Sequence, residues 1–209
     1  DTAEHKARKQ RQAQGKNPWN SFYLGCVHSY RGLYKAKSGS LISGFVNAKK
    51  GLKYLEEALE LDSTLYDACL GLGAYKYWAG SFYKYLKWLP WISDEREEGV
   101  KLVELAVEKG SFSFLVGINS LGWIELDREN YQKALALFEE GLRAIPESRF
   151  FLWGMAETSF KAGMYEGALR YYEEIRRSLK SEVYHNGYNE LTCLVQMAEA
   201  ACRLGHYRT

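Results

Sequence analysis

Apolar and small side chains recur every three or four residues along most of the chain, the period of a helix with one buried face. Between residues 130 and 145 these positions are Tyr131, Ala134, Leu135, Phe138, Leu142 and Ile145. Capping-box pairs, which mark helix starts, occur at Thr64 with Asp67 and at Asp94 with Glu97. Because strand signals are weak throughout, the pattern predicts an all-α chain of antiparallel helices joined by short polar loops.

The pattern repeats internally. Residues 115–148 align with residues 149–182 at an offset of 34. The alignment matches residues of similar size: Gly122 with Ala156, Leu121 with Met155, Ala134 with Ala168, Tyr131 with Tyr165, and Phe138 with Tyr172. Small residues allow the two helices of a hairpin to approach closely, and an aromatic ring fills the space beside them. A repeat of this length predicts a stack of helical hairpins.

The best-defined repeat resembles the tetratricopeptide repeat family. The resemblance is carried by Gly122-Trp123-Ile124, Asn130-Tyr131-Gln132-Lys133-Ala134, Phe138, Gly141 and Pro146. It implies a right-handed α-solenoid, an α–α superhelix of hairpins at roughly residues 18–62, 64–110, 112–146 and 148–181. A final repeat over 187–209 is incomplete, which would leave an apolar helix face uncovered.

We expect a single repeat domain over residues 18–209, preceded by a flexible polar segment over 1–17. That segment carries an excess of basic residues: Lys6, Arg8, Lys9, Arg11 and Lys16, against Asp1 and Glu4. The spacing of the second hairpin also requires an aromatic insertion at about 79–93. We therefore expect one globular domain with two segments outside the repeat pattern.

Composition narrows the classes of function. The formal net charge of the 209 residues is only +2, which disfavours a nucleic-acid binder. The 46% share of hydrophobic residues excludes wholesale disorder, and no apolar run is long enough to span a membrane. The four cysteines form no C-x-x-C pair and do not decide the cellular compartment.

Signatures of catalysis and metal binding are absent from the sequence. The four histidines form neither an H-E-x-x-H motif nor a metal-ligand spacing. Gly71-Leu72-Gly73 lacks the third glycine of a dinucleotide-binding loop and falls inside an expected helix. We therefore expect no enzymatic activity, no cofactor and no metal ion.

The strongest compositional signal is the aromatic segment over residues 75–91, which also carries three lysines and no acidic residue. Packing of its rings onto neighbouring hairpins is the favoured interpretation. A partner-binding surface is the second, and a membrane-interface element the third. Trp88 and Trp91 would be the surface anchors in the last two cases.

The family resemblance implies a concave groove lined by the first helix of each hairpin. Transferring the groove positions selects Asp67, Tyr77, Trp78, Asn119, Trp123, Asp127, Trp153, Glu157, Phe160, Lys161 and Arg203. The lysine and asparagine clamp by which some members hold a peptide's terminal carboxylate is not reproduced, since only Asn119 partly fits it. The implied groove is aromatic and suits an apolar peptide or a partner helix.

These observations favour a non-enzymatic protein–protein interaction module or scaffold with a protein or peptide partner. Two alternatives remain: a structural component of an exported or membrane-associated assembly, and a small-ligand binder or enzyme with a site at the insertions. A narrower resemblance to exported bacterial repeat proteins rests on residues 30–34, 65–73 and 86–90. It implies a periplasmic or outer-membrane-associated location, with the cytoplasm still open and membrane contact less favoured.

Overall fold

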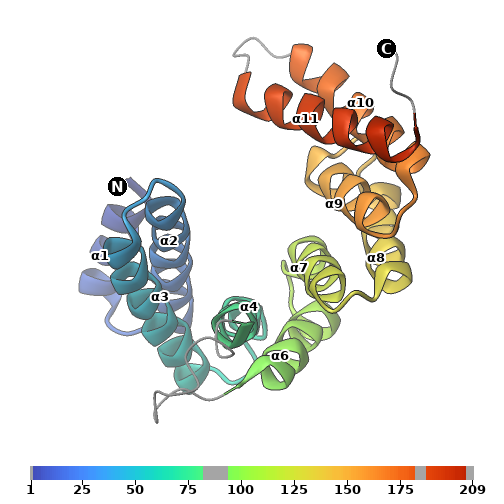
Figure 1. Cartoon of the computed structure of the whole chain (residues 1–209). Coiled ribbons are helices and arrows are strands. Elements are labelled where there is room, and N and C mark those ends of the chain that lie inside the picture. The colour runs from blue at the N-terminus through green and yellow to red at the C-terminus, as the bar shows by residue number, and fades with distance from the viewer. Residues whose placement is uncertain (1, 82–93, 182–186, 206–209) are drawn as a thin grey trace. The chain divides into compact units, whose positions relative to one another are not determined.

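The chain is built from helices that follow one another as hairpins (Figure 1). A computed structural model describes residues 2–81, 94–181 and 187–205, and none of these lies in a strand. The helices are α1 (Thr2–Gln14), α2 (Pro18–Lys37), α3 (Leu41–Leu61), α4 (Asp67–Ser81), α6 (Arg96–Lys109), α7 (Phe114–Asp127), α8 (Tyr131–Ala144), α9 (Arg149–Lys161), α10 (Tyr165–Lys180) and α11 (Gly187–Arg203). The predicted all-α fold of helical hairpins is confirmed.

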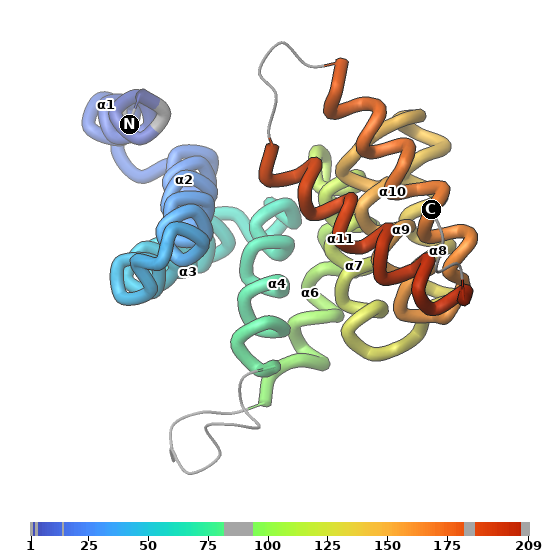
Figure 2. Tube along the Cα trace, turned by 45° about the horizontal axis from the view of Figure 1, so that its top comes forward, coloured from blue at the N-terminus to red at the C-terminus, as the bar shows by residue number. Residues whose placement is uncertain are grey.

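The chain divides into two compact units, residues 1–117 and 118–209, with the boundary inside α7. In the first unit, α2 packs along α3 and α4 packs along α6 (Figure 2). In the second unit, α8 packs on α9, α9 on α10, and α10 on α11.

The 34-residue period reappears in the backbone of the second unit. The turn after α7 has Glu129 with φ 62°, and the turn after α9 has Gly163 with φ 76°. Each turn residue donates its N–H to the carbonyl three residues earlier: Glu129 to Leu126 and Gly163 to Phe160, both at 3.1 Å. Since the two turns lie 34 residues apart and share this left-handed cap, the sequence repeat is also a repeat of hydrogen bonding.

Close packing in the second unit depends on one aromatic ring. Phe138 of α8 is fully buried, and a Cβ atom added to Gly122 of α7 would lie 2.5 Å from that ring. Gly154 of α9 has the same ring as its nearest neighbour. Ala134, one turn before Phe138, is also fully buried. The glycines and the alanine thus make room for a ring shared by three helices.

The first unit brings helix backbones still closer together. A Cβ atom on Gly32 of α2 would lie 2.9 Å from the backbone nitrogen of Ala48 and from the carbonyl oxygen of Gly44, both in α3. Gly73 of α4 and Gly99 of α6 meet in the same way, with a Cβ on Gly99 only 2.7 Å from the Gly73 carbonyl oxygen. Any side chain at these four glycines would push the helices apart.

The N-terminal segment differs from the flexible tail that we expected over residues 1–17. Residues 2–14 form α1, which packs on α2. Arg11 donates two hydrogen bonds to the Glu57 carboxylate of α3, at 2.7 and 3.0 Å, and Lys16 lies 2.8 Å from the same group. At the other end of α1, Glu4 pairs with Arg31 of α2 at 2.6 Å. Two of the basic residues of this segment are therefore paired with a carboxylate that is distant in sequence.

Two further expectations concern the second hairpin. Most of the insertion expected at 79–93, including Trp88 and Trp91, lies outside the described residues. The predicted capping pair of Thr64 and Asp67 is replaced by other bonds, because the Thr64 hydroxyl donates to Asp62 at 2.6 Å. Asp67 instead accepts a hydrogen bond from the Ser113 hydroxyl at 2.7 Å. Asp62 therefore binds Thr64 locally, and the Asp67 carboxylate binds a segment more distant in sequence.

Replacing Ala134 with leucine tests the packing around Phe138. Because Ala134 is fully buried where α8 meets its neighbours, three extra carbon atoms force side chains or backbone to move. We expect Ala134→Leu to lower the free energy of unfolding by about 1–3 kcal/mol, measured by urea denaturation. Ala136→Leu, on the exposed face of the same helix, should change it by less than about 0.5 kcal/mol. Equal stability of the two variants would contradict this packing.

Replacing Glu57 with glutamine tests the attachment of α1. Hydrogen bonds from Arg11 lower the pKa of the Glu57 carboxyl from 4.5 to about 2. The ion pair therefore stabilises the fold fully above about pH 4.5, and its contribution is lost as the pH falls towards 2. We expect Glu57→Gln to cost about 2 kcal/mol at pH 7 and progressively less in acid. A stability difference between variant and wild type that does not change with pH would show that the pair contributes nothing.

Candidate binding groove

Two tryptophans on the first helices of the second unit are each half-buried against a buried ring. The rings of Trp123 in α7 and Phe138 in α8 meet edge to face at 5.6 Å and 68°. Trp153 in α9 meets Tyr172 in α10 at 6.0 Å and 70°. Since Phe138 and Tyr172 are completely buried, each tryptophan is braced on one side by the core and retains part of its surface for contact.

One of these positions carries a tryptophan in the first copy of the repeat and a glutamate in the second. Trp123 corresponds to Glu157 and Phe138 corresponds to Tyr172 at the offset of 34. In the second copy the aromatic contact is replaced by a hydrogen bond, which the Tyr172 hydroxyl donates to the Glu157 carboxylate at 2.7 Å. Burial, and then this carboxylate, raise the pKa of Tyr172, so the hydroxyl remains a donor. The candidate groove therefore combines an apolar surface with an adjoining carboxylate.

Asn119 has a structural role at this site. Its side chain is buried, and its amide donates to the backbone carbonyl of Phe150 at 2.9 Å. This bond joins α7 to the start of α9, so it sets the spacing of the two helices that carry the tryptophans. Asn119 positions the groove and does not offer its side chain to a partner.

The remaining candidates of the second unit provide exposed charge and one further ring. Phe160 is half-buried against Tyr165, with ring centroids 5.6 Å apart. Asp127 at the end of α7 and Lys161 at the end of α9 are both exposed. Arg203 is exposed on α11 and lies 3.7 Å from Glu199 of the same helix. These charges can contribute to partner selection without being buried themselves.

The candidates of the first unit are mostly interior. Asp67 is 3% exposed and accepts hydrogen bonds from the backbone N–H groups of Ser111 and Phe112, at 2.9 and 2.8 Å. Burial alone would raise the pKa of Asp67, but these donors outweigh burial and lower it. Tyr77 is 1% exposed, whereas Trp78 beside it is 38% exposed. Of the three, only Trp78 presents a large surface to a partner.

Sequence patterns gave no sign of a buried carboxylate next to the groove candidates. Glu125 of α7 is 1% exposed and accepts hydrogen bonds from Lys133 at 2.6 Å and from Asn130 at 2.8 Å. Burial raises its pKa, and the bonds from Lys133 and Asn130 more than reverse that effect. The group is fully paired, so it fixes the turn between α7 and α8 and is not a reactive site.

The last helix, α11, exposes one apolar face. α11 buries Cys193 and Ala200 against the rest of the unit. Its opposite face exposes Tyr188, Leu191 and Val195, at intervals of three and four residues. Within the described residues this stripe has no covering helix.

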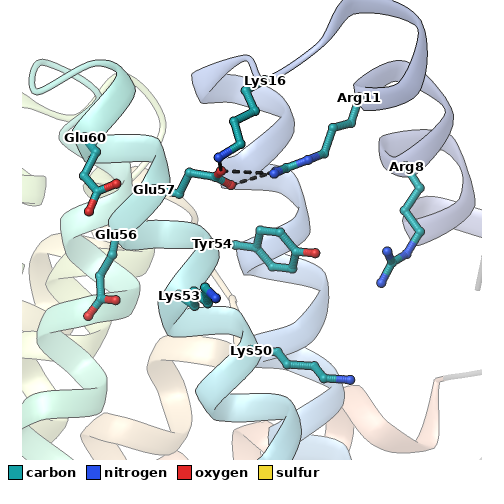
Figure 3. Close-up of a pocket in the computed structure, with 9 residues that line it drawn as sticks. All are labelled: Arg8, Arg11, Lys16, Lys50, Lys53, Tyr54, Glu56, Glu57 and Glu60. Atoms are coloured by element: carbon teal, nitrogen blue, oxygen red, sulfur yellow. Dashed lines mark hydrogen bonds and ion pairs between the residues drawn. The ribbon is translucent and has the colours of Figure 1, made fainter.

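A cavity in the first unit lies between α1 and α3 (Figure 3). Its volume is about 620 Å³, and both Arg11 and Lys16 reach across it to Glu57. Charges of both signs therefore pair with each other in this cavity. Among the described residues, no cluster of histidine, cysteine and carboxylate side chains could hold a metal ion, and no helix is long and apolar enough to cross a membrane.

Comparison with known proteins identifies the fold. No protein-family model matches the sequence, and no curated protein matches it either. The structure is similar to the crystal structure of PilW, a widely conserved type IV pilus biogenesis factor, with a TM-score of 0.67. The match covers 97% of this chain and 77% of PilW at 14% sequence identity. At that identity the likeness concerns the fold alone, and the chain has the helical-repeat fold seen in PilW.

Proposed function

We propose that the second unit is a non-enzymatic protein-interaction module that binds an apolar peptide or a partner helix across α7 and α9. Trp123, Trp153 and Phe160 provide the apolar contacts, and Glu157, Asp127 and Lys161 select the partner by charge. Arg203 of α11 is a further charged contact in the same proposal. Trp78 in the first unit is a separate candidate contact.

The observation that carries the proposal is the pair of half-exposed tryptophans, each packed on a fully buried ring. Tryptophan is among the residues that contribute most to protein–protein affinity. Binding usually loses free energy because side chains must be ordered, and a ring already fixed by the core avoids most of that loss. The repeat scaffold thus supplies preorganised contacts.

The proposed setting is the assembly of an exported structure, in the periplasm or at the outer membrane. What supports it is the structural likeness to PilW, whose function is in type IV pilus biogenesis. A helical-repeat scaffold suits assembly, because stacked hairpins present an extended surface to partner chains. The partner itself is a protein or peptide, consistent with contacts that are aromatic and only sparsely charged.

Peptides selected from a display library on the immobilised wild-type protein provide a direct test. We expect selected peptides to be rich in apolar residues and to lose affinity when Trp123 and Trp153 are replaced with alanine. Loss of two braced rings should weaken binding by at least about thirtyfold, or about 2 kcal/mol, measured by fluorescence anisotropy. Circular dichroism would establish that the double variant is folded.

The matched control is Phe112→Ala, which removes a ring that is 75% exposed in the first unit. It should leave the affinity of the same peptides unchanged. Peptides that bind the double variant as tightly as the wild type would overturn the groove assignment. Selection of peptides that respond to Phe112 instead would move the binding surface to the other unit.

A further inference from the structure

The turn between α2 and α3 carries the densest group of exposed apolar side chains in the described structure. We call it the hairpin tip and define it as residues 30–50. Its apolar members, all at least 47% exposed, are Tyr30, Leu33, Tyr34, Leu41, Ile42, Phe45 and Val46. Ile42 is 84% exposed and Tyr34 is 70% exposed. Apolar side chains gathered in this way mark a surface that contacts something other than water.

The hairpin tip is also strongly basic. Between Glu4 and Glu56 the sequence contains no acidic residue. The tip carries Lys35, Lys37, Lys49 and Lys50, and no carboxylate among the described residues pairs with any of them. Arg31 also lies in this region, but its charge is neutralised by Glu4. The tip therefore combines exposed apolar surface with four uncompensated positive charges.

The tip is a closed hairpin. Within it, Gly32 and Gly44 bring α2 and α3 into backbone contact. The turn closes through Gly39 at φ 83°, and the backbone N–H of Ser40 donates to the Lys35 carbonyl at 2.9 Å. The exposed side chains therefore project from a hairpin whose two helix backbones are in contact.

The positive charge of the tip favours one kind of binding partner for this surface over the others. A second copy of the chain would place four lysines against four lysines, and the sequence around them offers no acid to compensate. A bilayer with anionic headgroups fits this surface, because it accepts apolar side chains, attracts lysines and needs no fixed shape.

We propose that the hairpin tip docks this protein on anionic lipid membranes. Leu41, Ile42 and Phe45 enter the boundary between headgroups and acyl chains. Tyr30 and Tyr34 lie at the headgroup level, where tyrosine is favoured, and the lysines contact lipid phosphates. The sequence pointed to Trp88 and Trp91 for any membrane contact, whereas this proposal rests on a different hairpin.

Co-sedimentation with vesicles tests the proposal on the full chain. The probes are vesicles of phosphatidylcholine alone and vesicles in which phosphatidylglycerol replaces a third of it. We expect binding to the anionic vesicles and at least tenfold weaker binding to the neutral ones. Raising the salt concentration should weaken binding, since the attraction of exposed lysines is screened.

Two pairs of matched variants separate the tip from the rest of the molecule. Ile42→Ser with Phe45→Ser should abolish vesicle binding, whereas Leu191→Ser with Val195→Ser, which removes exposed apolar side chains of α11, should leave it intact. Lys35→Gln with Lys37→Gln should weaken binding about twenty-five-fold, at about fivefold for each lysine. Lys101→Gln with Lys109→Gln removes the same charge elsewhere, also from exposed side chains, and should have much less effect.

Each outcome decides the question. Ile42, Phe45 and Lys37 are exposed and Lys35 is partly exposed, so the variants should fold, and circular dichroism checks this. Wild-type protein that fails to bind anionic vesicles, or folded tip variants that bind as well as the wild type, would overturn the proposal. Binding to polyglutamate through the same lysines, without vesicle binding, would overturn it in favour of an acidic protein partner. The groove variant Trp123→Ala with Trp153→Ala should bind vesicles normally, so this test is independent of the proposed peptide-binding function.

Discussion

The close approach of paired helices is the constraint on which this structure depends. At Gly32 and Gly73, even one added carbon atom would collide with the backbone of the facing helix. In the second unit the space is occupied by the Phe138 ring, and the glycines lie around that ring instead. Small residues therefore fix the distance between helices, and that distance determines which side chains are buried and which are displayed.

Buried carboxylates then fix the turns between these helices. Asp67 binds two backbone N–H groups and a hydroxyl in the loop before α7, and Glu125 binds Lys133 and Asn130 in the loop after it. In both cases the bonds outweigh the effect of burial on the pKa, so the groups remain charged. Charge buried within the repeats thus serves to hold loops.

Two displayed surfaces follow from this arrangement, and they suit different partners. The tryptophans of α7 and α9 are braced by the core, and the hydrogen bond from Asn119 sets the spacing of the two helices that carry them. This arrangement suits an apolar chain. The α2–α3 tip is apolar and basic, which suits an anionic bilayer. Under the two proposals, the second unit contacts a partner chain and the first unit contacts a membrane.

The sequence by itself determined the helices and their repeat. The period of three and four residues and the 34-residue offset depend on local spacing, so they correctly identified Ala134, Phe138 and Tyr172 as buried. Groove positions could be selected only through the family resemblance, and that pattern did not distinguish a displayed ring such as Trp123 from a spacer such as Asn119.

Tertiary structure decided everything that depends on residues distant in sequence. The N-terminal segment looked like a solvated basic tail because the partner of Arg11, Glu57, lies 46 residues away. Asp67 looked like a local cap for the same reason, since its donors lie 44 to 46 residues further on. Helix periodicity records which face is apolar, but only the folded chain shows whether another element covers that face, and at the α2–α3 tip none of the described residues does.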